Sequence, residues 1–307
     1  MGTGFRQGWV GVACIALAQF ASTGVIAADA GALKVTSDKT ATGFVYPESV
    51  GCDPGGKALY VSQFGGTQLK PAEKDGLGFV SKVAADGKIL EARFLPAHGE
   101  TLNKPKGIWI AGNRLWVTDI DGVWVYDLKS RKGRKLDLPG IQFANDPAVR
   151  GNVLYVTDNR SDQLFKVEPA DFLDAKVQPK VSVVFAGKSV NPNGVFPGAG
   201  DSLLVVGFMS ADSPRAIFTV GKDGEPKPIS TPIGRLDGLY RMGDGTLLVT
   251  DWNSGSLFSW KGEGTKQELA TGFKGPADFC VMPKGAGLTV YVPDLVKGEV
   301  RIIQLSR

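Results

Sequence analysis

The chain has 307 residues, of which 43% are apolar, and it carries a formal net charge of +4. This length supports a large core in one or two domains, and 41 glycines with few long helical patterns favour an all-β architecture. So small a net charge excludes a nucleic-acid-binding surface built on bulk electrostatics, and no nucleic-acid partner is expected.

The first 27 residues have the composition of a cleavable signal peptide. Arg6 provides a positive charge, "GWVGVACIALAQF" is a short apolar stretch, and Val25 and Ala27 fit the positions that a signal peptidase reads. The apolar stretch is too short for a comfortable membrane span, so an uncleaved anchor is the lesser alternative. We therefore expect a mature domain of residues 28–307, periplasmic or secreted, without integral membrane association.

The mature chain repeats one strand–turn–strand unit six times. Each copy holds a short apolar run, a turn containing glycine, and a second run rich in Leu, Val, Tyr or Trp. The copies begin about 40 to 58 residues apart, which is typical of propeller blades. They occupy residues 47–61, 105–117, 146–156, 192–206, 236–249 and 276–292. With two further strands after most copies, the sequence predicts a single all-β domain, a six-bladed β-propeller with four-stranded antiparallel blades.

The last copy lacks a fourth strand. The segment "ALKVTSD" at 32–38 has the composition of a strand and no partner in the first copy. We expect this N-terminal strand to complete the last blade and to close the ring, because closure removes two open sheet edges.

Four of the second runs end in an aspartate. A short carboxylate at a tight turn accepts backbone N–H groups, so we expect a structural role for these residues. They are Asp119, Asp158, Asp251 and Asp294.

The residues at the start of the innermost strands should converge at one mouth of the central channel. Aligned on the position after Pro or its substitute, they are Glu48, Lys106, Asp146, Asn193, Asp237 and Ala277, with Asn145 just before Asp146. Turn chemistry explains Asn-Gly and Asp-Gly, but glutamate is a poor turn former. Converging carboxylates repel one another unless a cation or proton intervenes, and oxygen ligands suit Ca²⁺. A zinc site built from imidazoles is excluded because His98 is the only histidine.

The order of these motifs resembles the SMP-30/gluconolactonase family of six-bladed propellers, with paraoxonases as more distant relatives. The matching motifs are Glu48 in "YPESV", Asn145 in "AND", Asn193 in "PNGV" and Asp237 in "LDGL". The resemblance covers nearly all of the mature chain. It implies one divalent cation held by Glu48, Asn193 and Asp237, with Asn145 as a further ligand or a substrate-positioning group. Ca²⁺ is the expected ion, and Zn²⁺ and Mn²⁺ stay open.

The resemblance also implies a small-molecule substrate and hydrolysis of a lactone or related ester. In such a reaction a cation polarises the carbonyl, and Asp237 is expected as the general base. Two residues depart from the family: Pro147 replaces a glycine, and Phe143 stands where sugar-lactone enzymes carry arginine. Phe143 as a substrate-binding residue favours a more apolar substrate, whereas the alternative is that it packs between blades.

Two points stay open at this stage. A non-catalytic propeller that binds a ligand or an envelope protein, as similar NHL-repeat propellers do, is the alternative function, and a lyase is a third. Cys52 and Cys280 remain in the mature chain, and either one disulfide or two unpaired thiols fits the sequence.

Overall fold

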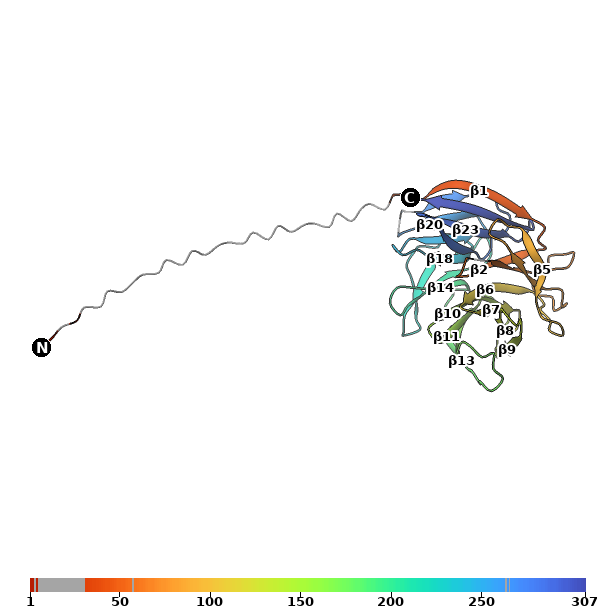
Figure 1. Cartoon of the computed structure of the whole chain (residues 1–307), viewed down its shortest axis with the longest axis horizontal. Coiled ribbons are helices and arrows are strands. Elements are labelled where there is room, and N and C mark those ends of the chain that lie inside the picture. The colour runs from red at the N-terminus through yellow and green to blue at the C-terminus, as the bar shows by residue number, and fades with distance from the viewer. Residues whose placement is uncertain (3, 5–30, 57, 263, 265) are drawn as a thin grey trace. The chain divides into compact units, whose positions relative to one another are not determined.

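The computed structural model describes the whole chain except residues 3, 5–30, 57, 263 and 265 (Figure 1). The chain divides into two units, Met1–Ala32 and Leu33–Arg307, and every strand of the described residues lies in the second. The predicted signal peptide, 1–27, and the predicted start of the mature domain at residue 28 lie almost entirely outside the described residues. Among the residues that the structure describes, no helix is long and apolar enough to cross a membrane.

Residues Leu33–Arg307 form the predicted six-bladed β-propeller, with four antiparallel strands in each blade. Blade 1 contains β2 (Pro47–Cys52), β3 (Leu59–Gln63), β4 (Phe79–Val83) and β5 (Ile89–Leu95). Blade 2 contains β6 (Pro105–Ala111), β7 (Arg114–Asp119), β8 (Gly122–Asp127) and β9 (Gly133–Asp137). Blade 3 contains β10 (Ala144–Arg150), β11 (Val153–Asp158), β12 (Gln163–Glu168) and β13 (Lys180–Ala186).

The remaining blades repeat this order, and the innermost strands β2, β6, β10, β14 and β18 follow one another around the centre of the ring (Figure 1). Blade 4 contains β14 (Pro192–Pro197), β15 (Leu203–Gly207), β16 (Ile217–Val220) and β17 (Pro226–Pro228). Blade 5 contains β18 (Leu236–Arg241), β19 (Leu247–Asp251), β20 (Ser256–Trp260) and β21 (Gln267–Ala270). Blade 6 contains β22 (Cys280–Lys284), β23 (Gly287–Asp294), β24 (Glu299–Ser306) and, as its outermost strand, β1 (Lys34–Thr42).

The N-terminal strand completes the last blade, as predicted from its composition. β1 pairs with β24 from Lys34 opposite Ser306 to Thr42 opposite Glu299. In Figure 1 the red-orange β1 lies along the blue strands that end the chain. The two ends of the domain are therefore held in one sheet, which closes the ring without leaving an unpaired strand there.

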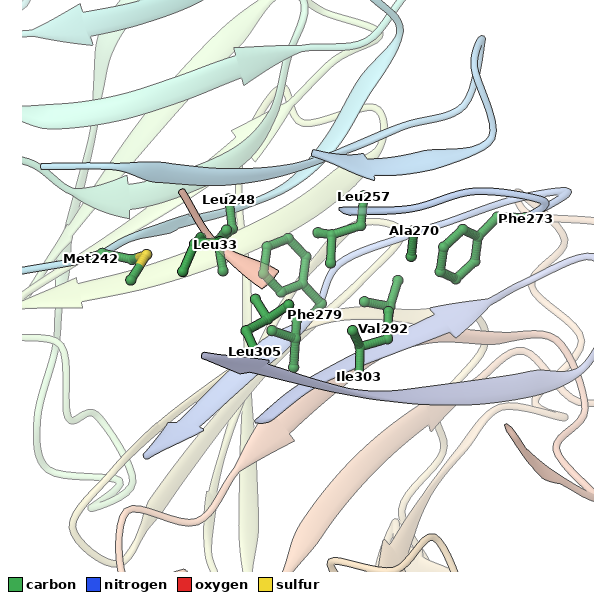
Figure 2. Packing of buried hydrophobic residues seen from close by; sticks show 11 residues of the cluster. Leu33, Met242, Leu248, Leu257, Ala270, Phe273, Phe279, Val292, Ile303 and Leu305 are labelled. Carbon is green, nitrogen blue, oxygen red and sulfur yellow. The ribbon is translucent and has the colours of Figure 1, made fainter. Parts of the chain in front are cut away.

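The core lies between the blades, because successive side chains of a strand point to opposite faces of its sheet. In β19, Leu247 and Val249 pack toward blade 4, whereas Leu248 packs toward blade 6. Figure 2 shows the second of these cores, in which Leu248 and Leu257 of blade 5 face Phe279 and Val292 of blade 6. Strands buried on both faces explain the nearly continuous apolar runs of the sequence.

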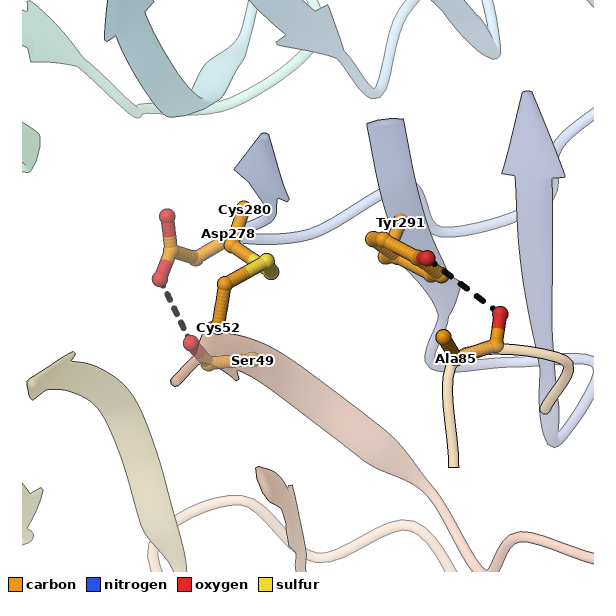
Figure 3. The surroundings of a disulfide bond; sticks show 6 residues. All are labelled: Ser49, Cys52, Ala85, Asp278, Cys280 and Tyr291. Carbon is orange, nitrogen blue, oxygen red and sulfur yellow. Dashed lines mark hydrogen bonds between the residues drawn. A yellow bond between two sulfur atoms is a disulfide. The ribbon is translucent and has the colours of Figure 1, made fainter. Parts of the chain in front are cut away.

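A disulfide joins the innermost strands of the first and last blades (Figure 3). Cys52 of β2 and Cys280 of β22 are bonded, with their Cα atoms 5.7 Å apart and a sequence separation of 228. Ser49 Oγ donates a hydrogen bond of 2.5 Å to Asp278 Oδ2 across the same seam. A crosslink over so long a loop restricts the unfolded chain, worth about 5 kcal/mol in the chain-entropy model. The disulfide, which the sequence left open, thus reinforces ring closure at the channel wall.

The aspartates at the ends of the second strands, here called the turn aspartates, are held as expected by backbone N–H groups. Both carboxylate oxygens of Asp158 accept such bonds, from Gln142 to Oδ2 at 2.6 Å and from Arg160 and Ser161 to Oδ1 at 3.0 and 3.1 Å. The same arrangement recurs at Asp119 and Asp294, whereas at Asp251 the backbone N–H groups donate to Oδ1 and Oδ2 accepts from the Ser254 hydroxyl. These carboxylates tie each loop to its strand.

Candidate functional site

Each of the first five innermost strands begins with a β-bulge. In blade 5, Leu236 pairs with Asp251 and Leu239 with Val249, so Asp237 and Gly238 oppose the single residue Thr250. The register shifts at the same place in the other four blades, with one more residue on the inner strand than on its partner. A bulge re-aims a side chain and leaves it outside the regular ladder. The first bulge residues are Glu48, Lys106, Asn145, Asn193 and Asp237.

This register corrects the alignment of blade 3. Ala144 pairs with Asp158 and Pro147 with Val156, so Asn145 is the first bulge residue and Asp146 is the second. Asn145, and not Asp146, is therefore the equivalent of Asn193. In blade 6 the corresponding residue after the Pro276–Asp294 bridge is Ala277, which offers no side-chain ligand.

In blades 2 and 4 the second bulge position is a glycine, and the neighbouring bulge leaves no room there for a side chain. A Cβ atom at Gly194 would lie 2.2 Å from the carbonyl oxygen of Asp237, and one at Gly107 would lie 2.4 Å from Asp146 Oδ1. Gly194 thus allows blades 4 and 5 to pack closely and also forms part of the bulge.

Hydroxyl groups of the second strands fix these bulges across the blade interfaces. Thr157 Oγ1 of blade 3 donates 2.6 Å to the carbonyl oxygen of Asn193 in blade 4, and Thr118 does the same to Asn145. Since these two carbonyls are held by the preceding blade, the side chains of Asn145 and Asn193 are positioned by contacts between blades as well as by their own loops.

Four of the five first bulge residues carry a buried oxygen that has no hydrogen-bond partner in the structure. Glu48, Asn145, Asn193 and Asp237 are each 5% exposed or less. Buried polar atoms without a partner are rare, and each requires an explanation. The four atoms, here called the mouth oxygens, are Glu48 Oε2, Asn145 Oδ1, Asn193 Oδ1 and Asp237 Oδ1.

Burial perturbs the carboxyl groups of this site. It raises the pKa of Asp237 to about 8, helped by the negative charge of Asp278 and opposed by the hydrogen bond from Trp252. Burial also raises the pKa of Glu48 well above its usual value, and the nearby Asp237 adds to that rise. Both residues therefore hold protons unusually tightly as long as no cation balances their charge.

The mouth oxygens line one cavity of about 700 Å³, here called the mouth cavity. Its volume lies in the range of small-molecule sites. All five residues predicted as ligands or substrate contacts, Glu48, Phe143, Asn145, Asn193 and Asp237, are among its lining residues. His98, by contrast, is exposed and outside the lining.

The lining also contains Lys106, which was expected at the mouth without an assigned role, and Trp252, Arg160 and Arg235, which were not predicted from the sequence. Lys106 is 1% exposed, and its burial lowers the pKa to about 8 against the opposing charge of Glu48. Trp252 donates its indole N–H to Asp237 Oδ2 at 2.9 Å and so orients that carboxylate. Arg160 and Arg235 complete the polar part of the lining. Lys106 was visible in the alignment of the repeats, whereas the other three follow or precede the core strands in loops.

The donor set fits a hard cation. Two carboxylate groups and two side-chain amides each offer one buried oxygen that has no hydrogen-bond partner. Oxygen donors of this kind are the ligands that Ca²⁺ prefers, and two negative charges match a divalent ion. Across the described residues no group of three or more His, Cys, Asp or Glu side chains is arranged to hold a metal ion. The candidate set differs from such a group because half of its oxygens come from asparagine.

Fold and cavity together define a six-bladed propeller with a polar, ligand-sized cavity at one channel mouth. Comparison of the sequence with protein-family models and with curated proteins found no match. Solved structures match at the level of the fold. A provisionally assigned gluconolactonase is 15% identical with a TM-score of 0.65, over 89% of this chain and 94% of that one.

Two further structures show how widely this fold is used. Virginiamycin B lyase from Staphylococcus aureus is 15% identical with a TM-score of 0.57, covering 87% of this chain and 99% of its own. A nidogen/laminin complex contains a propeller 14% identical with a TM-score of 0.53, covering 86% of this chain and 92% of that one. At such identities the likeness establishes the fold, and function has to be argued from the site.

Proposed function

We propose that the protein is a hydrolase of lactones or related carboxylic esters that holds one divalent cation at the channel mouth. The observation that carries the proposal is the convergence of four buried, unpartnered oxygens from four blades on one cavity. Glu48, Asn145, Asn193 and Asp237 would hold the ion, with Ca²⁺ favoured by the all-oxygen donor set. The fold-level likeness to a gluconolactonase agrees with this reaction.

When bound, the cation would supply Lewis-acid polarisation of the substrate carbonyl. The chain's own residues have distinct tasks beside it. Trp252 occupies Asp237 Oδ2, so only Oδ1 is free to face the cavity as a ligand or to accept a proton as general base. Phe143 borders the same space and offers an apolar contact to the substrate.

A lyase is the second candidate because virginiamycin B lyase shares the fold. Hydrolysis inserts water into the product, whereas elimination leaves a double bond and inserts no oxygen. Turnover in ¹⁸O-labelled water therefore separates the two reactions. A non-catalytic binding propeller, the remaining alternative, would turn over no lactone in a broad panel.

We also propose that the protein works outside the cytoplasm. The Cys52–Cys280 disulfide supports this placement, because structural disulfides persist in oxidising compartments. Mass spectrometry of the mature chain from its native host tests it: an N-terminus near residue 28 is expected, and an intact Met1 would contradict it.

The proposed activity is tested by lactone hydrolysis before and after chelation. We expect activity to be lost on chelation and restored by Ca²⁺. Glu48→Gln should lower kcat/KM at least about 100-fold while the protein stays folded, since it removes one of the two anionic ligands that would hold the oxyanion-stabilising ion. Glu73→Gln, at an exposed glutamate paired with Lys70, is the matched control and should change nothing. Activity that survives both chelation and Glu48→Gln would refute the proposal.

A further inference from the structure

Three cationic side chains line the mouth cavity, and none of them is in an ion pair. Lys106, Arg160 and Arg235 lie in the lining, yet no carboxylate of the described residues is within 4.0 Å of any of the three. Glu48 and Asp237 are the only acidic residues in that lining. The cations therefore outnumber the carboxylates, and direct pairing within the protein does not neutralise them.

Two of the cations share one aromatic ring. Lys106 Nζ and the guanidinium carbon of Arg160 both lie 4.0 Å from the centre of the Phe143 ring. Lys106 donates one hydrogen bond, to the carbonyl oxygen of Lys104 at 3.2 Å, and no side-chain hydrogen bond of Arg160 is present in the described structure. Two like charges near one ring repel each other, so an anion placed between them would be stabilised by both.

The third cation, Arg235, also lies over aromatic rings of the cavity lining. The guanidinium of Arg235 lies 4.2 Å from the centre of the Phe208 ring and 5.3 Å from that of Trp252. Its Nε atom is buried and has no acceptor. Stacking on aromatic rings holds a guanidinium in place while it leaves the N–H groups at the edge available for a ligand.

Apolar side chains make up another part of the lining. Phe64 and Leu295 contribute to the wall, and Leu69 and Met209 remain 38% and 42% exposed at its edge. Large exposed apolar side chains that border a polar cavity indicate that a ligand covers them. The cavity thus combines hydrogen-bond donors of positive charge with an apolar surface.

We propose that the mouth cavity recognises ligands that join a carboxylate to an aromatic or aliphatic body, and that Arg160, Lys106 and Arg235 bind the carboxylate. A guanidinium matches a carboxylate with two parallel N–H donors. This ligand chemistry is argued from the cavity alone. Its extension to the substrate, a lactone or ester bearing a carboxylate, rests on the proposed function.

The test is calorimetric binding to the chelated protein at pH 7 with three probes: 3-phenylpropanoate, its uncharged amide 3-phenylpropanamide, and acetate. We expect 3-phenylpropanoate to bind about tenfold more tightly than the amide, because one charge-assisted hydrogen bond provides that factor, and about tenfold more tightly than acetate, because its phenyl group buries apolar surface. Arg160→Gln and Arg235→Gln should each reduce the preference for the carboxylate over the amide several-fold.

Arg93→Gln is the matched control. Arg93 also lies over a ring, 4.3 Å from the centre of Phe79, but outside the mouth cavity. It should leave the preference unchanged. Equal binding of the carboxylate and the amide, failure of all three probes to bind, or an equal loss in Arg93→Gln would overturn the inference.

Chelation separates this inference from the proposed hydrolase. A carboxylate preference that appears only after Ca²⁺ is added would refute recognition by the arginines while agreeing with a cation site. A preference that persists without the ion, in a protein that hydrolyses no lactone, would refute the hydrolase and leave the binding inference intact.

Discussion

The turn aspartates and the mouth residues have similar chemistry and burial but opposite hydrogen bonding. Asp158 is fully buried, and both of its oxygens accept backbone N–H groups. Asp237, 4% exposed, uses one oxygen with Trp252 and leaves the other without a donor. The two kinds of residue also lie near each other within one blade, since Leu236, which precedes Asp237, pairs with the turn aspartate Asp251 in blade 5. Burial alone therefore does not distinguish a structural carboxylate from a functional one, whereas the hydrogen-bond inventory does.

The bulges create this difference. A turn aspartate ends a regular strand beside a loop whose N–H groups need acceptors, so the carboxylate and the loop satisfy each other. A mouth residue occupies the extra position of an inner strand and lines the mouth cavity, where one of its oxygens finds no backbone N–H group. The protein tolerates this unfavourable arrangement at a site, which is where strain and unpaired groups concentrate.

The largest expected effect contrasts one residue from each set. Asp158→Ala leaves three backbone N–H groups without their acceptor and should lower the free energy of unfolding by about 4 kcal/mol. Asp237→Asn replaces a carboxyl group whose charged form is penalised by burial when no cation balances it, so the chelated variant should be at least as stable as the chelated wild type. Urea denaturation of both variants measures the contrast. Equal destabilisation of the two would show that the mouth carboxylates are structural as well.

A smaller effect concerns the pH dependence of stability. The folded-state pKa of Asp237 is raised to about 8, so the folded chelated protein keeps a proton that the unfolded chain releases near pH 4. The associated stability is present below pH 4 and is lost as the pH rises toward 8. Bound Ca²⁺ replaces the proton and should flatten this dependence.

Thermal unfolding at pH 5 and pH 8, with chelator and with Ca²⁺, measures how strongly stability depends on pH in each form. Glu48, the other proposed carboxylate ligand with a raised pKa, contributes in the same direction as Asp237, whereas groups far from the site contribute equally to both series. Identical pH dependence with and without the ion would contradict the assignment of Asp237 as a ligand.

The smallest expected effect is on cation affinity. Asn193→Ala removes one neutral oxygen ligand and should weaken Ca²⁺ binding about tenfold, or about 1.4 kcal/mol, without unfolding the protein. Asn152→Ala, at an exposed turn between β10 and β11, is the control and should bind the ion as the wild type does. Unchanged affinity in Asn193→Ala would return this residue to a purely conformational role.

The blade architecture could be predicted from the sequence because each repeat carries its own signals: apolar runs, a turn, and an aspartate at the strand end. The N-terminal strand that completes blade 6 was predicted correctly for the same reason. The position of Asn145 was harder, because Asn145 and Asp146 are adjacent and only their pairing opposite Thr157 shows which one begins the bulge. Local sequence does not encode that register.

The two arginines of the mouth cavity were not predicted, for a different reason. Arg160 and Arg235 lie in loops, and their proximity to Phe143 and Phe208 depends on how neighbouring blades pack. The disulfide likewise depends on ring closure, which brings together two cysteines from opposite ends of the domain. Contacts between distant repeats follow from the closed ring and not from any single repeat.

The central claim is that the mouth oxygens form a cation site, and elemental analysis of the purified native protein tests it most directly. We predict one divalent ion per chain, removed by chelation and bound again from Ca²⁺ by the wild type but not by the Glu48→Gln, Asp237→Asn double variant. A native protein without stoichiometric divalent metal, whose stability Ca²⁺ does not change, would contradict it.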